Sequence, residues 1–224
     1  MRSGLFTSQR RLVPNWGLAM AGVMLATGLV AMTPLTVAAS STPYNTNLVK
    51  NSKAESGVTH WDTFPDGSFG TVKYGVSGLG YPSTYTASQM GGGKHFFWAG
   101  PYDSVYSGCG DAHQQILLTG IGSSIDSGNV KVKLSGYAGT NGAASLNAHL
   151  DVYFRNAQNH SVASNGITKV ASSTNEQYKH IKASKVLSKH TRILDVHLWA
   201  DGDDISSTNC QAFWDNISVS LVSA

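Results

Sequence analysis

Alternating apolar and polar residues near the C-terminus place the tightest limit on the folds open to this chain. In Gln211–Leu221 (QAFWDNISVSL), Ile217, Val219 and Leu221 alternate with polar residues. A period of two is typical of a β-strand with one buried face. Because a strand at this position is expected to close a sheet, we predict that it pairs with a first strand in Asn47–Trp61, near the start of the mature chain.

Further strand patterns lie between these two ends and are separated by turn signals. The clearest is Asn129–Tyr137 (NVKVKLSGY), in which Val and Leu alternate with Lys and Ser. Since no stretch reads as a convincing amphipathic helix and no internal repeat occurs, we predict an all-β fold, one antiparallel β-sandwich. The other predicted strands are Thr71–Val76, Lys94–Ala99, Gln114–Leu118, Ser145–Phe154, Tyr178–Val186 and Arg192–Ala200. The aromatic residues predicted to lie in the core are Trp61, Phe96, Phe97, Phe154 and Trp214.

The first 39 residues have the pattern of a secretory signal peptide. Met1–Arg11 carries arginines and no acid, Trp16–Met32 is apolar, and Val37-Ala38-Ala39 fits a cleavage site of small residues. The alternative is an uncleaved membrane anchor, but the apolar run is shorter than the ~20 residues that a spanning helix needs. We therefore expect residues 1–39 to be removed, residues 40–46 to form a linker and residues 47–224 to form a single secreted domain.

The basic character of the sequence belongs to the segment that we expect to be removed. Arg2, Arg10 and Arg11 account for all of the formal net charge, since +3 − 3 = 0 for the rest. A chain without a net positive field has no electrostatic basis for binding nucleic acid. Charged residues make up only 13% of the chain, as in many exported β-proteins. We expect a monomer that has no membrane contact after cleavage.

The two cysteines, Cys109 and Cys210, both lie in the part predicted to be exported. An even pair in an oxidising compartment favours a disulfide over two buried thiols. Such a bond would close a loop of about 100 residues, which the chain-entropy model values at ~4.7 kcal/mol. Neither cysteine belongs to a Cys-x-x-Cys pair or lies beside a histidine, which argues against a metal site.

Signals of enzymatic chemistry are weak in this sequence. Gly91-Gly92-Gly93 is not followed by Gly-Lys-Ser/Thr, so it is not a phosphate-binding loop. The DGDD run that begins at Asp201 lacks the distal Glu of an EF-hand and is read as a turn. Asp151 and Asp195 are the acids on predicted strand faces, and a glycosidase acting through this pair is the least favoured hypothesis.

A carbohydrate platform is predicted on the polar faces of two strands. In Ser145–Phe154 and Arg192–Ala200, the residues opposite the apolar set combine aromatic rings with amide, carboxyl and imidazole groups. Rings pack on the apolar C–H faces of sugars, while polar side chains bind the hydroxyl groups. The predicted ligand-binding residues are Asn147, His149, Asp151, Tyr153, His197 and Trp199.

The order of the motifs resembles a known family across essentially the whole mature chain. The motifs are NLVKNSKAES, KHFFWAG, QQILL, SGNVKVKLSGYAG, AHLDVYF, TRILDVHLW and FWDNISVSL. This order is similar to that of the galactose-binding-like jelly-roll family, which includes many secreted bacterial carbohydrate-binding modules. The resemblance implies a jelly-roll β-sandwich. It carries no sugar-binding residue over to this chain, because those residues vary between family members.

A structural calcium ion is also implied by the resemblance. Spacing alone makes Glu55 and Asp215 weak candidates for calcium ligands, since calcium takes six to eight oxygen atoms. In the family, an opening glutamate and a closing aspartate commonly bind calcium together with backbone carbonyls, and Glu55 and Asp215 occupy those positions. This chain has Ser52, Lys53 and Ala54 where the family often has a glycine.

These observations together predict a secreted, non-catalytic module that binds a glycan or cell-wall polysaccharide. A structural or adhesive envelope protein that recognises a protein partner is the second hypothesis. A hydrolase acting through Asp151 and Asp195 is the third. The biological role of a module without an attached catalytic domain is not predicted.

Overall fold

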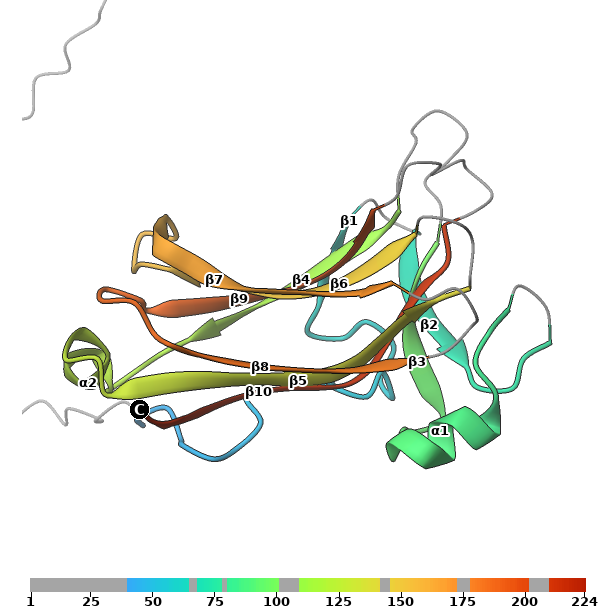
Figure 1. Ribbon diagram of the computed structural model, residues 1–224, viewed down its shortest axis with the longest axis horizontal. Coiled ribbons are helices and arrows are strands. Elements are labelled where there is room, and N and C mark those ends of the chain that lie inside the picture. Colours follow the sequence, from blue (N-terminus) through green and yellow to red (C-terminus); the bar gives the residue numbers. More distant parts are fainter. Residues whose placement is uncertain are drawn as a thin grey trace, which may run out of the picture. The chain divides into compact units, whose positions relative to one another are not determined.

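The described part of the protein is an antiparallel β-sandwich of two five-stranded sheets (Figure 1). The computed structural model describes residues 40–64, 68–77, 80–100, 109–141, 146–172, 178–201 and 210–224. The predicted signal peptide, residues 1–39, lies outside the described residues. The all-β, jelly-roll prediction is confirmed.

Sheet A has the strand order β1-β4-β9-β6-β7, and sheet B has the order β2-β3-β10-β5-β8. The strands of sheet A are β1 (Asp62–Phe64), β4 (Asp111–Leu117), β9 (Ile193–Asp201), β6 (Asn147–Arg155) and β7 (Ser161–Ser172). The strands of sheet B are β2 (Phe69–Lys73), β3 (His95–Ala99), β10 (Ala212–Ser223), β5 (Val130–Thr140) and β8 (Lys179–Val186). All the neighbouring strands pair antiparallel.

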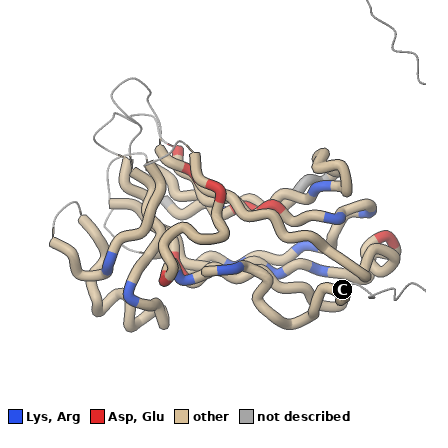
Figure 2. Tube along the Cα trace, turned by 180° about the vertical axis from the view of Figure 1, so that it is seen from behind, with Lys and Arg blue, Asp and Glu red and all other residues tan. Residues whose placement is uncertain are grey.

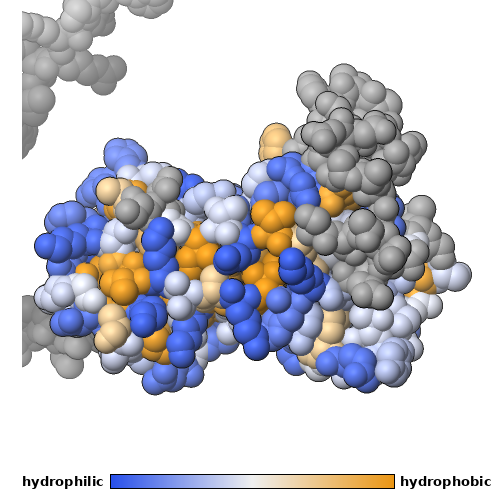
Figure 3. Space-filling model, viewed as in Figure 1, coloured by the Kyte–Doolittle hydropathy of each residue, from blue (hydrophilic) through white to orange (hydrophobic). Residues whose placement is uncertain are grey.

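The core lies between the two sheets and is built from the apolar positions of the alternating strands. Ile217, Val219 and Leu221 of β10 are fully buried, as their alternation predicts. Trp214 is also fully buried, and its Nε1 donates a hydrogen bond to His149 O of sheet A at 2.9 Å. On the surface shown in Figure 3, apolar residues show through between the two layers. Burial of these faces determines which faces of the sheets point to solvent.

The segment predicted as the first strand lies where we expected but is not a regular strand. It runs beside β10, since Leu48 N donates to Val219 O and Ile217 N donates to Ser52 O. From residue 50 to 60 it consists of turns, and Asn51, Ala54 and His60 have positive φ angles. Left-handed residues interrupt a strand, so the prediction is correct in position and wrong in conformation.

Two strands and two short helices were missed. β1 has only three residues, and β7 contains an Asn-Gly pair that reads as a turn in the sequence. The helices are α1 (Thr84–Met90) and α2 (Gly122–Asp126). The Ser83 side chain caps α1 by accepting a hydrogen bond from Thr86 N. Among the described residues, no helix is long and apolar enough to cross a membrane.

A second apolar cluster lies outside the main core and includes a residue that the sequence had assigned to that core. Phe96 is fully buried, but it packs with Tyr74, Ala87 and Phe213 instead of with the main core. Its neighbour Phe97 faces the main core, because successive side chains of a strand point to opposite faces. The Ala87 contact brings α1 over this side of β3 and β10, as Figure 1 shows.

The predicted Cys109–Cys210 disulfide is present, with a Cα–Cα distance of 5.5 Å. Cys109 lies just before β4 of sheet A, and Cys210 lies just before β10 of sheet B. The bond therefore ties the two sheets together at the start of one strand from each.

Candidate functional site

The six residues of the predicted platform come together on the outer face of sheet A. In the antiparallel pairing of β6 and β9, His149 lies opposite Trp199, and Asp151 lies opposite His197. Tyr153 follows along the same face of β6. Residues two apart on a strand share a face, and directly opposite residues are in contact distance. The structure thus places the candidate residues side by side, while their role in binding remains a prediction.

The side chain of Trp199 is held in place by a buried carboxylate. Its Nε1 donates a hydrogen bond to Asp151 Oδ2 at 2.8 Å, and its ring stacks on His149 with the centroids 3.8 Å apart. Asp151 is fully buried and also accepts hydrogen bonds from Tyr153 OH at 3.0 Å and from Lys169 N at 3.1 Å. Charge-assisted hydrogen bonds of this kind restrict the orientation of both rings.

Tyr153 keeps its proton in this arrangement. Burial and the nearby charge of Asp151 raise the pKa of Tyr153 to about 12. The hydroxyl group therefore remains a donor to Asp151 at neutral pH.

A second carboxylate orients His197. Asp195 Oδ2 lies 3.1 Å from His197 Nε2 and accepts a hydrogen bond from Arg155 Nε at 2.6 Å. Burial raises the pKa of Asp195, but the hydrogen bond and charge of His197, with those of Arg155, outweigh burial and leave the pKa below its ordinary value. Asp195 is therefore an anionic acceptor at neutral pH.

Asn147 and Asp201 complete one end of the face. Asn147 Nδ2 donates to Asp201 Oδ1 at 3.0 Å, and His149 Nε2 lies 3.0 Å from the same oxygen. The rest of the DGDD run, including Asp203 and Asp204, lies outside the described residues. Asp201 thus accepts a hydrogen bond from Asn147 and lies beside His149.

The sequence analysis missed His113 of β4, which extends the row of rings onto a third strand. His113 lies opposite His197 in the sheet, and their rings stack with the centroids 5.1 Å apart. Tyr153 meets His197 edge-on at 4.9 Å. The predicted strand began at Gln114, three residues late, so the alternation of Asp111, His113 and Gln115 was not used. We call the row His113, His197, Tyr153, His149 and Trp199 the ring strip.

Members of the ring strip differ in accessibility. His149 is buried beneath its neighbours, whereas Trp199, Tyr153 and His197 are partly exposed. The predicted contact residues therefore divide into partly exposed groups, which reach solvent, and the buried Asp151 and His149, which position them.

The geometry does not favour the hydrolase hypothesis. A glycosidase needs one carboxyl group that is protonated at the working pH. Asp151 accepts three hydrogen bonds, and Asp195 has a pKa below its ordinary value. Asp151 positions neighbouring side chains through these hydrogen bonds, and Asp195 is an anionic acceptor, which are different roles from that of a general acid.

The two predicted metal ligands, Glu55 and Asp215, also come together, at the opposite sheet. A Cβ atom built on Gly92 would lie 2.6 Å from Asp215 Oδ2, and one built on Gly93 would overlap Glu55 Oε1. The glycine run is thus explained by the close approach of two carboxylates. Lys53 Nζ lies nearby and donates to Gly91 O at 2.9 Å.

Asp215 is buried and electrostatically strained. Its Oδ2 accepts a hydrogen bond from Tyr74 OH at 2.7 Å, and its Oδ1 accepts one from Asn216 N at 2.6 Å. Burial, assisted by the charge of Glu55, nevertheless raises the pKa of Asp215 to about 6. A cation at this position would favour the charged form.

The pKa of Glu55 is shifted in the opposite direction from that of Asp215. Its Oε1 accepts hydrogen bonds from Lys94 N at 2.7 Å and from His95 N at 2.9 Å. Burial raises the pKa of Glu55, but these backbone bonds, together with the hydrogen bond and charge of the His95 side chain, outweigh burial and leave the pKa below its ordinary value.

The carboxylate oxygens of Glu55 and Asp215 are of the kind that a hard cation prefers. Two side chains alone supply fewer ligands than such a cation takes. Calcium prefers carboxylate and carbonyl oxygens, and takes six to eight of them. Within the described ranges, no group of three or more His, Cys, Asp or Glu side chains is placed to hold a metal ion. The remaining ligands would therefore be backbone carbonyls and water.

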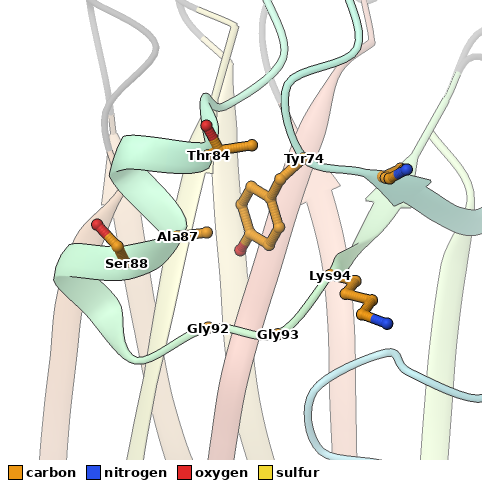
Figure 4. Close-up of a pocket in the computed structure, with 8 residues that line it drawn as sticks. Tyr74, Thr84, Ala87, Ser88, Gly92, Gly93 and Lys94 are labelled. Carbon is orange, nitrogen blue, oxygen red and sulfur yellow. The ribbon is translucent and has the colours of Figure 1, made fainter.

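A pocket of about 290 Å³ adjoins the carboxylate pair (Figure 4). The ring of Tyr74 points into it between α1 and the Gly92–Gly93 segment, and Lys94 lies on the far side of these glycines from α1. None of the residues that line this pocket belongs to the predicted platform. The outer face of sheet A and this pocket are therefore separate places on the molecule.

Solved structures with a similar fold include carbohydrate-binding modules. TmCBM61, solved in complex with β-1,4-galactotriose, has a TM-score of 0.50 and 11% sequence identity, covering 80% of this chain and 99% of the module. The CBM22-1 xylan-binding domain of Paenibacillus barcinonensis Xyn10C has a TM-score of 0.47 and 12% identity, covering 82% of this chain and 99% of that domain. At these identities the similarity shows the fold alone.

A third similar structure belongs to a longer protein. The enzymatically active domain of bacteriophage CBA120 tailspike protein 4 has a TM-score of 0.49 and 14% identity. The match covers 79% of this chain but only 21% of the tailspike chain. No family model matches the sequence. No curated protein sequence matches it either.

Proposed function

We propose that this protein is a secreted, non-catalytic module that binds a polysaccharide on the outer face of sheet A. The observation that carries the proposal is the ring strip, in which the buried Asp151 accepts hydrogen bonds from Trp199 and Tyr153. Trp199, Tyr153 and His197 offer partly exposed rings, and Asn147 offers an amide at one end of the same face. Pre-oriented rings lose little conformational entropy when a sugar packs against them.

The shared fold with carbohydrate-binding modules supports this proposal. TmCBM61 was solved with a bound β-1,4-linked galactose trisaccharide. We therefore include β-1,4-galactan among the first polysaccharides to test, while the ligand of this chain is to be identified by the experiment.

The test is a glycan and polysaccharide array with the protein from Ser40 onward, followed by calorimetry on the best ligand. We expect binding without release of reducing ends. Trp199→Ala should abolish binding while leaving the fold intact, as judged by circular dichroism. Absence of binding to every polysaccharide would overturn the proposal, and a pull-down of a protein partner would then test the adhesion hypothesis.

Secretion is part of the same proposal. If residues 1–39 are a signal peptide, the secreted protein begins at Ser40. Mass spectrometry of the protein recovered from the culture medium would show this N-terminus. A full-length N-terminus in the membrane fraction would favour the anchor.

We also propose that Glu55 and Asp215 hold a calcium ion with a structural role. When bound, the ion would neutralise two carboxylates that face consecutive glycines. Terbium, a calcium substitute whose luminescence is sensitised by nearby tyrosine, suits this site because Tyr74 OH lies 2.7 Å from Asp215 Oδ2.

We expect terbium luminescence that calcium displaces and that is lost in Glu55→Gln. His113→Gln, a change on the other sheet, is the matched control and should keep the signal. No terbium signal from the native protein, or a signal that persists in Glu55→Gln, would contradict the calcium proposal.

A further inference from the structure

The outer face of β5 and β8 carries lysines without acidic partners. Lys131 and Lys133 of β5 and Lys182 of β8 project to the side opposite the core. None of these three lysines forms an ion pair with a described residue, whereas Asp195 and Asp201 of sheet A are paired with neighbouring side chains. In the layer formed by sheet B, Figure 2 shows several Lys or Arg positions.

The pairing of the strands brings the lysines close to one another. Ser184 lies opposite Lys133, and Lys182 lies opposite Ser135. Lys133 and Lys182 are therefore diagonal neighbours, which places their Cα atoms about 7–8 Å apart. Lys131 precedes Lys133 by two residues, or about 7 Å along β5. The same four residues, Lys133, Ser135, Lys182 and Ser184, line a shallow depression on this face.

Two stacked rings continue the same face. Tyr137 lies opposite His180, and their centroids are 4.4 Å apart with an angle of 12° between the rings. His180 is exposed, and its Nε2 lies 3.3 Å from Ser135 Oγ. Burial and the charge of Lys182 both lower the pKa of His180. A neutral ring pair thus adjoins a cationic depression that also carries hydroxyl groups.

The remaining charge on these strands does not compensate the lysines. Asp215 is the acidic residue of sheet B, and it lies opposite Tyr137. Its carboxylate is fully buried and accepts hydrogen bonds from Tyr74 OH and Asn216 N. Within the described part of sheet B, the lysines therefore present a positive potential to solvent that no acidic side chain offsets.

We propose that this surface, formed by Lys131, Lys133, Lys182, Ser184 and the Tyr137–His180 pair, is a second binding site, for a polysaccharide that carries carboxylate, sulfate or phosphate groups. The lysines bind the anionic groups, and the ring pair packs against the apolar face of a sugar. The site lies on the opposite side of the sandwich from the ring strip and does not depend on it.

Charge and shape favour this occupant over two others. Outside residues 1–39 the formal net charge is zero, so the chain has no extended field for nucleic acid, whose binding depends on many phosphate contacts. The large apolar side chain exposed among these positions is Val186. A membrane surface would require a larger apolar set to insert.

The test measures binding of polygalacturonate, dextran sulfate and uncharged dextran to the protein from Ser40 onward. We expect binding to at least one of the two anionic polymers and none to dextran. Binding should weaken as the salt concentration rises from about 50 mM to about 300 mM, because exposed charges are screened. The triple variant K131Q/K133Q/K182Q should bind about tenfold more weakly.

The matched control is K50Q/K169Q/K189Q, which removes the same charge from three exposed lysines elsewhere. It should keep the native affinity for the anionic polymer. Equal losses in the two triple variants would overturn the proposal, because net charge alone would then explain binding. So would lysine-dependent binding to duplex DNA or phosphatidylglycerol vesicles without binding to either anionic polysaccharide.

Trp199→Ala separates this site from the proposed function. It should leave polyanion binding unchanged while it abolishes binding of the ligand of sheet A. If the array in the previous subsection finds no ligand, polyanion binding that depends on the three lysines would still establish the second site. Loss of polyanion binding in Trp199→Ala would overturn the assignment to sheet B.

Discussion

The outer faces of the two sheets have opposite chemistry, although both come from alternating strands of one sandwich. On sheet A, Asp151 and Asp195 hold neighbouring rings and cations through short hydrogen bonds. On sheet B, Lys133 and Lys182 stand in solvent without a described ion-pair partner. In Figure 2, basic residues occur along the sheet B layer, while the sheet A layer carries both acidic and basic residues.

This difference in surface chemistry should give the two faces different ways of selecting a ligand. Fixed side chains recognise a shape through contacts that act over a few ångströms, and salt affects these contacts little. Exposed lysines attract any suitable anion over a distance of roughly the Debye length, about 10 Å at 0.1 M salt. We therefore expect sheet A to provide selectivity and sheet B to provide salt-sensitive attachment.

The largest effect should come from the bond that joins the two faces. Cys109→Ser combined with Cys210→Ser removes the link between β4 and β10. Because the closed loop spans a sequence separation of 101 residues, we expect a loss of ~2–5 kcal/mol in the free energy of unfolding. Urea denaturation measures it. A loss below ~1 kcal/mol would show that the core holds the sheets together without the disulfide.

The second largest effect should show which of the two faces binds the ligand of sheet A. Trp199→Ala should abolish detectable binding of the sheet A ligand, a loss of about 30-fold or more, as expected for an aromatic residue at the centre of a site. Tyr137→Ala removes a ring of similar exposure from sheet B and should not change this affinity. Calorimetry on both variants makes the comparison. Equal losses would mean that the ligand does not discriminate between the two faces.

A smaller effect tests the positioning role of the buried carboxylate. Asp151→Asn keeps the size of the side chain but weakens acceptance from Trp199 Nε1 and Tyr153 OH. We expect about a tenfold loss of affinity, together with a changed tryptophan fluorescence spectrum, because the hydrogen bond of the indole is weakened. Affinity should fall without any change in hydrolysis. Hydrolytic activity in the native protein that disappears in Asp151→Asn would support the hydrolase hypothesis instead.

The smallest effect concerns pH and calcium at Asp215. The pKa of this group is about 6 in the folded protein, above the usual ~3.9 of an unfolded chain. The folded state therefore binds the extra proton, and this contribution to stability is lost as pH rises from about 4 to about 6. Asp215→Asn removes the titration, so its melting temperature should rise relative to the native protein over that range, measured in chelator.

Added calcium should reverse the pH dependence of the stability of the native protein. Because a cation favours the charged carboxylate, added calcium should stabilise the native protein more at pH 7.5 than at pH 5. It should have no such effect on Asp215→Asn. A difference between the two proteins that stays constant with pH would show that Asp215 has an ordinary pKa.

Much of the sandwich could be predicted because strand periodicity is a local property. The ranges predicted for β5, β6, β8 and β9 differ from the observed ones by at most three residues at either end. β7 was missed because its Asn-Gly pair resembles a turn. Residues 50–60 form turns because several of them, such as Ala54, have positive φ angles. An alanine in the sequence does not predict such an angle.

The candidate sites were predicted in part. From the polar faces of β6 and β9, we predicted six residues that do lie together. The sequence did not predict that Asp151 is buried beneath two rings. His113 could not be included, because only the strand order places β4 beside β9. Lys131 and Lys133 were seen as an outward set, yet their neighbour Lys182 depends on the pairing of β5 with β8.

The sequence by itself determined which residues alternate, and hence which side of each strand avoids water. It also determined the disulfide, because only two cysteines exist to form it. The tertiary structure decided which polar sides meet: Glu55 beside Asp215 at two glycines, rings on sheet A and lysines on sheet B. The reason is physical. Alternation depends on neighbours along the chain, whereas strand order and register depend on packing of the whole core.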